Sequence, residues 1–425
     1  MIDWWRFTEE SCLNEAQVVK TVVVVCEVAE VQGGAEKVAI ESSLALADSG
    51  LNVIFFAASG PTDPRLSAHP NIEVKLVREQ YVVDELPERE RILRATYDRV
   101  SQSAFDNLLK QLDPEHTVVH MHAWRFALTS SILKPLFDSS VAVVYTLHEF
   151  GIGCPYVGFY DYRRNAICPQ RGGSLGCMMT NCNRTSFKHK TWIFYKNGVI
   201  PNWLGQRRHF RHCIFVSEFS RQILRDYVAP EAKQYLVRNP IEIPKRPARE
   251  FSAGGAFLFV GRMTLEKDPL TLARAAKMRG LPVEFVGDGP QSEATRKENP
   301  DAVLHGWLSS DLVVERMRQA RALVFPSVWY ETLGLTVYEA AANGVPAIVS
   351  NVTAACDFVE HGVNGLVFRA GDAEDLAQKM AMMTDDEASR MGMAAYDRYW
   401  ANPMTVESHL TGLLQVYTEA LEDRQ

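Results

Sequence analysis

Short apolar runs rich in β-branched and aromatic residues alternate with helical or irregular segments in two successive series along this chain. Such alternation is typical of parallel sheets with helices on both faces. The first series of predicted strands comprises Lys20–Cys26, Leu51–Ala57, Thr117–His122, Val141–Leu147 and Cys213–Ser217, and the second comprises Phe257–Val260, Val283–Val286, Ala322–Phe325 and Ala347–Ser350. Because 425 residues are too many for one core, we expect two doubly wound α/β domains.

A proline-punctuated passage separates the two series. It includes Pro240, Pro244 and Pro247 and leads into a glycine pair at 254–255. Clusters of this kind interrupt regular structure, so we place the linker there. The predicted domains are residues 1–242 and 243–404, and the final helical stretch at 405–425 is a candidate to pack back on the first domain.

Composition narrows the classes of function. The formal net charge of −7 argues against a general nucleic-acid binder. No apolar run reaches the roughly 18 residues that a membrane span needs. Asp3, Glu9 and Glu10 also differ from the basic start of a signal peptide. We therefore expect a cytoplasmic protein that does not bind nucleic acid.

Two glutamates, Glu331 and Glu339, bracket a glycine where a loop turns into a predicted helix. The apolar run Ala322–Phe325 precedes them, so the segment lies at the carboxyl end of a strand. In open α/β sheets the N–H groups of the following helix attract anions at this edge. We predict a phosphate near Leu333 and Gly334, and sugar hydroxyls near Glu339. Two ordinary surface glutamates are the alternative interpretation.

Two cations follow the predicted strand Phe257–Val260. Arg262 and Lys267 come directly after it, and Pro269 suits the first turn of the next helix. Fixed cations in a dry cleft stabilise the negative charge of a departing nucleoside diphosphate. Solvated surface charges are the alternative. We favour the first interpretation because both cations lie at strand ends in the same domain as Glu331.

Two features lie at strand ends of the first domain. Gly33 and Gly34 stand between a strand and a helix, where the backbone turns tightly and can approach a ligand. A purely structural turn explains them nearly as well. His120 and His122 close the predicted strand Thr117–His122, and the period of two places both on one face. A structural histidine that caps the sheet edge is the alternative to a ligand contact.

Together these motifs resemble glycosyltransferase family 4, whose members are retaining GT-B enzymes that use nucleotide sugars. The resemblance rests on Gly33-Gly34-Ala-Glu, Gly261-Arg262 with Glu266-Lys267, Gly287-Asp-Gly-Pro290, Pro326-Ser327 with Glu331 and Glu339, and Gly344-Val-Pro346, in this order. It covers about residues 20–400 and is strongest from Gly261 to Gly371. It implies the GT-B fold, in which two Rossmann-like domains face each other across a cleft.

The resemblance also implies roles for individual residues. Arg262 and Lys267 would hold the diphosphate, Glu339 the ribose, and Glu331 with the following loop the donor sugar and phosphate. A histidine positioned like His122 contacts the donor sugar in this family, so we favour His122 over His120. The predicted catalytic residues are His122, Arg262, Lys267 and Glu331, and the predicted donor-binding residues are Gly33, Gly34, Gly287, Gly289, Leu308, Thr332, Leu333, Gly334 and Glu339.

The implied reaction moves a sugar from a UDP- or GDP-sugar to a saccharide or lipid-linked saccharide in the synthesis of a cell-surface glycan. Configuration at the anomeric carbon is retained, and no cofactor takes part in catalysis. The leaving phosphate oxygen accepts the proton of the acceptor, so positioning and electrostatics carry the reaction. A nucleotide-sugar epimerase or hydrolase of the same fold and a degenerate zinc-binding module are the alternatives.

A cysteine-rich insertion at about residues 150–185 contains four of the eight cysteines of the chain, namely Cys154, Cys168, Cys177 and Cys182. Clustered cysteines in a cytosolic protein favour a metal over disulfides, and four thiolates suit tetrahedral zinc. The spacing is looser than in paired C-x₂-C motifs. We therefore hypothesise a structural zinc, with reduced buried thiols and an iron–sulfur cluster as competing interpretations.

The stretch between Tyr162 and Ser217 contains ten Lys and Arg but no Asp or Glu. Aromatic residues such as Trp192 and Trp203 are interleaved with these cations. This pattern suits an interfacial helix on anionic lipid, or a mouth that receives a lipid-diphosphate acceptor. A helix whose aromatic residues pack on the domain is the alternative. We predict peripheral contact with the inner face of the membrane through residues 186–212.

Overall fold

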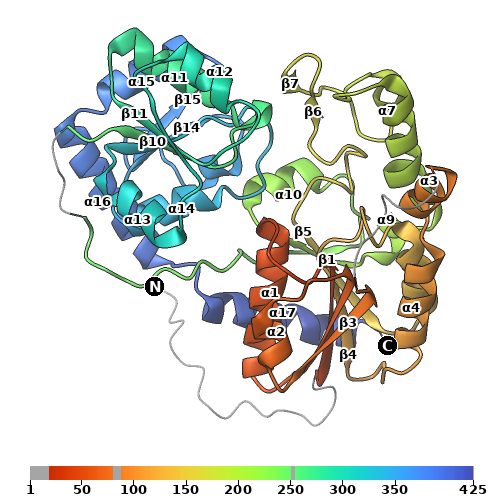
Figure 1. Cartoon of the computed structure of the whole chain (residues 1–425). Coiled ribbons are helices and arrows are strands. Elements are labelled where there is room, and N and C mark those ends of the chain that lie inside the picture. Colours follow the sequence, from red (N-terminus) through yellow and green to blue (C-terminus); the bar gives the residue numbers. More distant parts are fainter. Residues whose placement is uncertain (1–18, 80–87, 250–253, 425) are drawn as a thin grey trace. The chain divides into compact units, whose positions relative to one another are not determined.

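The computed structural model describes residues 19–79, 88–249 and 254–424. Two larger sheets and one antiparallel hairpin organise these residues (Figure 1). The chain groups into two compact units. One contains the described residues up to Thr146 together with His209–Cys213 and 410–424, and the other contains Leu147–Arg208 and Ile214–His409. The N-terminal acidic residues and part of the predicted linker passage lie outside the described residues.

The seven-stranded sheet has the order β3-β2-β1-β4-β5-β8-β9. Its central strand β1 pairs in parallel with β2 and β4, and Val23 lies opposite both Ile54 and Val119. All five strands predicted for this part are present, with ends shifted by at most two residues. The strands are β1 (Thr21–Val28), β2 (Asn52–Ser59), β3 (Ile72–Arg78), β4 (Thr117–Met121), β5 (Ala142–Leu147), β8 (His212–Phe215) and β9 (Lys233–Leu236).

Helices cover both sides of strands β1 to β4 (Figure 1). The ring of Phe105 in α4 lies 4.8 Å from that of Phe56 in β2, so α4 packs on the sheet. The helices around this sheet in sequence are α1 (Gly34–Asp48), α2 (Pro64–Ala68), α3 (Glu88–Thr96), α4 (Arg99–Leu109), η1 (Ser130–Ile132), α5 (Leu133–Asp138) and α10 (Glu218–Leu224).

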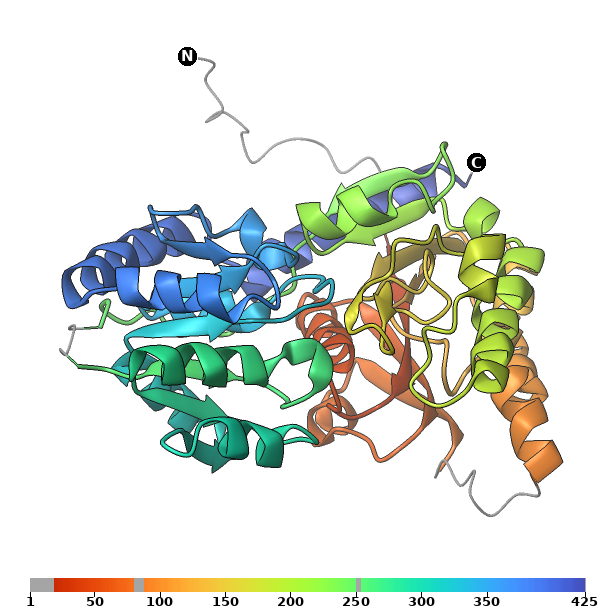
Figure 2. The same ribbon diagram turned by 90° about the horizontal axis from the view of Figure 1, so that it is seen from above.

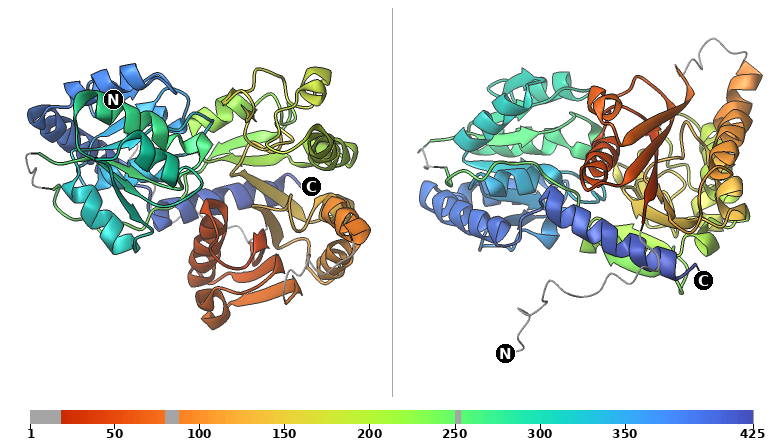
Figure 3. Two further views of the ribbon diagram at one scale, coloured as in Figure 1. Left: turned by 45° about the horizontal axis from the view of Figure 1, so that its top comes forward. Right: turned by 90° about the horizontal axis from the view of Figure 1, so that it is seen from below.

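The C-terminal helix α17 (Val406–Glu422) returns to this sheet (Figure 3). The hydroxyl of its Tyr417 lies 2.7 Å from Nδ1 of His120 in β4, and both side chains are buried. The residues from Leu410 onward therefore belong to the same compact unit as the first strands of the chain.

The six-stranded sheet has the order β12-β11-β10-β13-β14-β15, and its strands pair in parallel. For the four strands predicted here, the first and last residues agree with those in the structure. Two more strands, which the sequence pattern did not predict, form the edges of the sheet. The six are β10 (Phe257–Val260), β11 (Val283–Val286), β12 (Val303–Gly306), β13 (Ala322–Phe325), β14 (Ala347–Ser350) and β15 (Gly365–Phe368).

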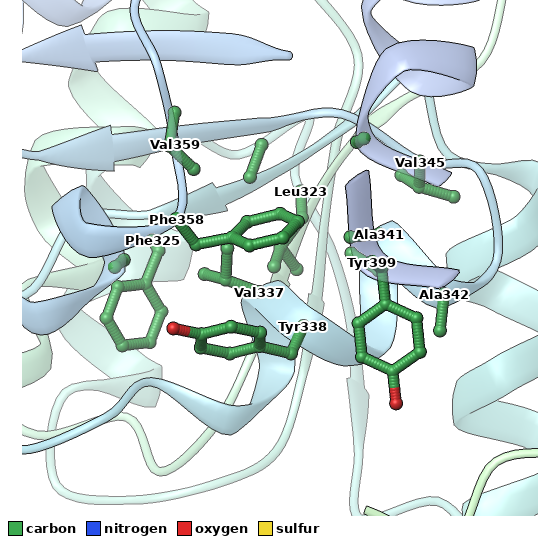
Figure 4. Close-up of a cluster of buried hydrophobic side chains, with 14 of the residues drawn as sticks. Leu323, Phe325, Val337, Tyr338, Ala341, Ala342, Val345, Phe358, Val359 and Tyr399 are labelled. Carbon is green, nitrogen blue, oxygen red and sulfur yellow. The ribbon is translucent and has the colours of Figure 1, made fainter. Parts of the chain in front are cut away.

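Alternate residues of this sheet belong to two different cores. Phe257 and Phe259 pack with α11 and α15, whereas Leu258 packs with α14 and α16. Figure 2 shows helices on both sides of the sheet. Figure 4 shows the second core, in which the rings of Phe358 and Tyr338 lie 4.9 Å apart and are tilted by 49°. The helices are η3 (Leu265–Lys267), α11 (Pro269–Arg279), α12 (Ser292–Glu298), α13 (Ser310–Gln319), α14 (Leu335–Ala342), η4 (Ala354–Asp357), α15 (Ala373–Met382) and α16 (Asp385–Ala401).

The cysteine-rich segment has little regular structure until residue 187. It contains the hairpin β6 (Tyr160–Asp161) and β7 (Ala166–Ile167) and the short helix α6 (Leu175–Met179). A nearly continuous helix follows, made of α7 (Phe187–Phe194), the π-helical turn η2 (Tyr195–Val199) and α8 (Ile200–Trp203), and then α9 (Gln206–His209). Within the described part of the chain, every helix is too short or too polar to cross a membrane.

Candidate active site

The loop after β10, which carries Arg262, packs tightly against the loop after β11. The amide of Gly261 donates to the carbonyl of Val286 at 3.0 Å. A Cβ atom at Gly287 would lie 2.0 Å from the carbonyl oxygen of Gly261, and one at Gly289 would lie 2.5 Å from that of Met263. Both positions also have positive φ, 120° and 156°. Only glycine fits at either position, so this predicted pair shapes the loop that presents Arg262.

The structure brings Lys267 and Glu331 together, although they lie 64 residues apart. Lys267 ends the short helix η3, and its Nζ lies 2.5 Å from Oε1 of Glu331. The same oxygen accepts from Trp329 Nε1 at 2.7 Å and from Ser327 Oγ at 3.0 Å. The ends of β10 and β13 are therefore joined by an ion pair. Arg262 is exposed and makes no ion pair with any residue that the structure describes.

The start of α14 lies beside this ion pair in sequence. Gly334 precedes the helix with φ of 77°, Leu333 is buried, and Thr332 Oγ1 donates to the carbonyl of His148 at 3.1 Å. Glu339 lies on the second turn and is half-buried. The predicted phosphate and ribose residues thus follow the carboxyl end of β13, where helix N–H groups favour an anion.

The two regions that contain the predicted donor-binding residues Gly287, Gly289 and Leu308 are also adjacent. The amide of Gly287 donates to the carbonyl of Gly306 at 2.8 Å. Beyond Gly306 the chain presents Trp307, which is 77% exposed, and Leu308, which packs partly on the core. The β11 loop and the segment that follows β12 therefore form one continuous edge.

The candidate residues of the other unit have different surroundings. His122 follows β4, is 1% exposed, and its Nε2 lies 3.2 Å from Nδ1 of His120. Its amide donates to the carbonyl of Val25 at 2.9 Å. Gly33 and Gly34 are exposed at the start of α1. These residues belong to a different compact unit from Lys267 and Glu331, and their predicted roles stay predictions.

One buried carboxylate escaped the sequence analysis. Glu27 lies near the end of β1 and accepts hydrogen bonds from the amides of Phe126 at 2.6 Å, Ala127 at 2.7 Å and Leu128 at 3.2 Å. Its partners are about 100 positions away, so no local pattern predicts the contact. The carboxylate fixes the loop that follows His122.

The four cysteines of the insertion lie near one another. Cys154, Cys177 and Cys182 are buried, Cys168 is half-buried, and none of the four forms a disulfide. Burial, and to a smaller extent the nearby Cys177 and Cys182, raise the pKa of Cys154 to about 12. Lys190 is 1% exposed, with its Nζ 3.8 Å from Sγ of Cys177. Among the described residues, no three or more His, Cys, Asp or Glu side chains are arranged to hold a metal ion.

Two family models together match most of the chain. The model described as "Glycosyltransferase Family 4" matches residues 32–244, which is half of the chain. The model described as "Glycosyl transferases group 1" matches residues 245–400. The boundary between the two matches lies in the proline-punctuated passage.

Curated relatives support this assignment. A GDP-mannose-dependent alpha-mannosyltransferase of Corynebacterium glutamicum is 30% identical over 165 residues, which are 38% of this chain and 39% of the relative. The match thus spans less than half the length of that relative. Glycogen synthase of Mycobacterium tuberculosis is 24% identical over 418 residues and matches over 89% of each chain.

Solved structures show the same fold. Sucrose-phosphate synthase from Thermosynechococcus elongatus aligns with a TM-score of 0.67 at 17% identity over 95% of this chain and all of that protein. A glycosyltransferase from Rickettsia africae aligns with a TM-score of 0.63 at 19% identity, covering 95% and 99% of the two chains. Anabaena HepE in complex with UDP aligns with a TM-score of 0.61 at 15% identity, covering 94% and 100%. The predicted fold class, with two doubly wound parallel-sheet domains of the GT-B type, is confirmed.

Proposed function

Because this chain belongs to glycosyltransferase family 4, we propose that it transfers a sugar from a nucleotide-sugar donor to a saccharide or lipid-linked saccharide in the synthesis of a cell-surface glycan. The ion pair between Lys267 and Glu331, next to the exposed Arg262 at the carboxyl ends of β10 and β13, carries this proposal. Cations fixed at this edge of a parallel sheet suit a diphosphate.

The residues predicted at the edge of the six-stranded sheet have separate tasks in this proposal. Arg262 and Lys267 hold the diphosphate, and Glu339 accepts hydrogen bonds from the ribose. Glu331 and the amides that open α14 bind the sugar and its phosphate. The nucleobase lies along the edge formed by Gly287 and the segment from Trp307 to Leu308.

The transfer retains the configuration of the anomeric carbon. The acceptor hydroxyl oxygen forms a bond to that carbon on the face from which the diphosphate leaves. The bond between the anomeric carbon and the phosphate oxygen breaks, and that oxygen takes the hydroxyl proton. The products are a glycoside and a nucleoside diphosphate. The protein contributes positioning and stabilises the growing negative charge, mainly through Arg262 and Lys267.

A panel of nucleotide sugars with saccharide and lipid-linked acceptors tests the proposal. UDP- and GDP-sugars come first, because HepE was solved with UDP and a relative is named for its dependence on GDP-mannose. Released diphosphate and the anomeric configuration of the product, followed by NMR, report the reaction. An α-linked product from an α-linked donor is expected. Donor isomerisation or hydrolysis that acceptors do not influence would favour the epimerase or hydrolase instead, and inertness with every donor would favour a binding module.

We also propose that the basic helical segment α7–η2–α8 contacts an anionic membrane surface. Tyr195, Val199 and Trp203 recur every four residues and are 53%, 43% and 83% exposed. Residues at this spacing lie on one side of a helix. Lys188, Arg207 and Arg208 are exposed nearby, and no acidic residue occurs from 163 to 217. Exposed aromatic residues flanked only by cations match an anionic lipid surface.

Vesicle co-sedimentation tests the membrane contact. We expect the protein to sediment with phosphatidylglycerol vesicles but not with phosphatidylcholine vesicles, and to be released by high salt. Trp203→Ala should lower the bound fraction several-fold. Trp307→Ala, which removes an equally exposed tryptophan next to the six-stranded sheet, should not. Negligible binding to both kinds of vesicle would contradict the membrane contact. It would favour the alternative, a helix whose aromatic residues pack on the domain. A cytoplasmic location, with the contact on the inner face, stays a prediction.

The structural zinc also stays a prediction. The closeness of the four cysteines supports it, since four neighbouring sulfur atoms match the tetrahedral ligand set of a structural zinc. The side-chain arrangement described above does not itself form a metal site. Metal analysis of protein purified without a histidine tag decides between a bound metal and reduced buried thiols. Less than a tenth of an equivalent of zinc or iron, at full thiol count, would establish reduced buried thiols.

A further inference from the structure

The residue that precedes Lys267 is a buried carboxylate. Glu266 lies in the middle of η3 and is 4% exposed. Its backbone carbonyl accepts the amide of Val328 at 2.9 Å, which ties η3 to the segment after β13. A buried carboxylate needs a charged or hydrogen-bonding partner, because leaving it unpaired is costly. It also lies next to the cations proposed to bind a diphosphate, where an uncompensated negative charge would oppose binding.

The partner of Glu266 comes from the cysteine-rich segment. Nη2 of Arg184 lies 2.8 Å from Oε2 of Glu266. The guanidinium also stacks on the ring of Tyr162, 4.0 Å from its centre. Burial and then the charge of Glu266 raise the pKa of Tyr162, so its hydroxyl stays neutral. Arg184 is thus held between a carboxylate and an aromatic face. This arrangement suits an arginine better than a lysine.

The turn that carries Arg184 is fixed on both sides. Cys182 and Asn183 are buried. Oδ1 of Asn183 accepts from the amide of Thr185 at 2.6 Å and from its hydroxyl at 2.8 Å. Nδ2 of Asn183 lies 2.8 Å from Nδ1 of His189 in α7. The guanidinium therefore starts from a well-anchored backbone, as a positioning residue requires.

We propose that Arg184 is a positioning residue for the donor diphosphate. By pairing with Glu266 it cancels the negative charge next to Lys267 and holds η3 in place, so that the Lys267 ammonium remains available to the diphosphate. Two successive residues of η3 are then each held by an ion pair, Glu266 by Arg184 and Lys267 by Glu331. The cysteine-rich segment thereby supplies part of the donor site. This inference rests on the proposed function.

Calorimetric titration with UDP and GDP, and with UMP and GMP, tests the role of Arg184. For whichever diphosphate the wild type binds, Arg184→Gln should weaken binding by about fivefold, the effect of losing a partly exposed ion pair. The monophosphate of the same base should bind almost unchanged. Arg184→Lys should recover part of the loss. Arg171→Gln, which removes an exposed cation from the same segment, should have no effect, and the melting temperature of all variants should stay within a few degrees of the wild type.

Lys267→Ala separates this inference from the proposed function. If Lys267→Ala loses diphosphate binding while Arg184→Gln binds like the wild type, the role of Arg184 is overturned and the donor site stands. If the wild type binds neither diphosphate, the proposed function itself fails. An equal loss of monophosphate and diphosphate binding in Arg184→Gln would show a general structural effect and overturn the positioning role. The exchange Arg184→Glu with Glu266→Arg should bind better than Arg184→Glu alone.

Discussion

Single side chains at the ends of β10 and β13 set the positive charge that a diphosphate would meet. Lys267 is paired with Glu331, whereas Arg262 is exposed. A diphosphate that draws the ammonium of Lys267 toward itself leaves Glu331 with the hydrogen bonds of Trp329 and Ser327. The carboxylate therefore stays satisfied, and the exchange does not leave a buried charge without a partner.

Replacing either cation should slow the reaction. We expect Lys267→Ala and Arg262→Ala each to lower kcat by about 100-fold or more, because each removes a group that stabilises charge in the transition state. Steady-state assays with the donor found in the panel measure the effect. Arg279→Ala, at the exposed end of α11, is the matched control and should keep full activity. Near-normal rates in both site variants would remove these residues from the mechanism.

Glu27 should stabilise the folded protein, because its carboxylate accepts hydrogen bonds from three backbone amides. Glu27→Ala leaves the amides of Phe126, Ala127 and Leu128 without their acceptor. We expect a loss of about 3 kcal/mol in the free energy of unfolding, since unsatisfied buried donors are costly. Urea unfolding measures it. Glu30→Ala, which removes an exposed carboxylate hydrogen-bonded to Gln32, should change stability by less than about 0.5 kcal/mol. Equal effects of both changes would contradict the role of Glu27.

Sequence reasoning finds residues at strand ends but not their distant partners. Arg262, Lys267 and Glu331 follow apolar runs that identify buried strands, so their shared edge was predictable. The contacts of Glu27 span about 100 positions and that of Arg184 with Glu266 spans 82. No local sequence pattern marks the residues at either end of these contacts. Only the fold brings the partners together.

At the scale of elements, central strands were predicted and edge strands were not. The strands in the middle of the six-stranded sheet are mostly apolar, with only Glu284 in β11 and Ser350 at the end of β14 as polar residues, and the pattern gives their ends. The edge strand β3, by contrast, alternates Ile72 and Val74 with Glu73 and Lys75 and is only partly buried. β3 contacts the core on fewer sides, so its composition resembles that of a loop. The edge strand β15 is apolar and largely buried, and the pattern nevertheless missed it.

The joined loops after β10 and β11 make a specific prediction. Gly287→Ala combines a positive φ with a Cβ atom 2.0 Å from a carbonyl oxygen. Gly280→Ala has a smaller backbone penalty, because its φ of 60° lies in the left-handed region that other residues can adopt, and nothing lies within 4 Å of its Cβ. We expect a loss of about 1 kcal/mol for Gly280→Ala and about 3 kcal/mol for Gly287→Ala. Thermal unfolding compares the two. Similar losses of stability in the two variants would show that the loops after β10 and β11 can move apart at little cost in free energy.

For the whole molecule, two histidines with lowered pKa, the half-buried His148 and the buried His409, link stability to pH. Burial, and then the nearby His409, lower the pKa of His148 to about 3. Burial lowers that of His409 to about 4. In the unfolded chain both groups bind a proton near pH 6.5. Between these values the unfolded chain binds more protons than the folded protein, so the folded state is fully stabilised above about pH 6.5 and loses stability as the pH falls.

Unfolding at two pH values tests this linkage. We expect the free energy of unfolding to fall by about 2 kcal/mol between pH 7 and pH 5.5, with each histidine contributing about half. The carboxylates with lowered pKa, Asp63, Asp113 and Asp288, titrate only below this window. Replacing both His148 and His409 by Asn should remove most of the pH dependence. An unchanged slope in that double variant would assign the effect to other groups.

The hydrogen bond between Tyr417 and His120 joins residues 297 positions apart. Because synthesis makes β4 long before α17, the first compact unit waits for nearly 300 further residues before this contact can form, even though most of its residues emerge early. A chaperone that protects nascent chains would therefore meet this unit incomplete throughout the synthesis of those residues.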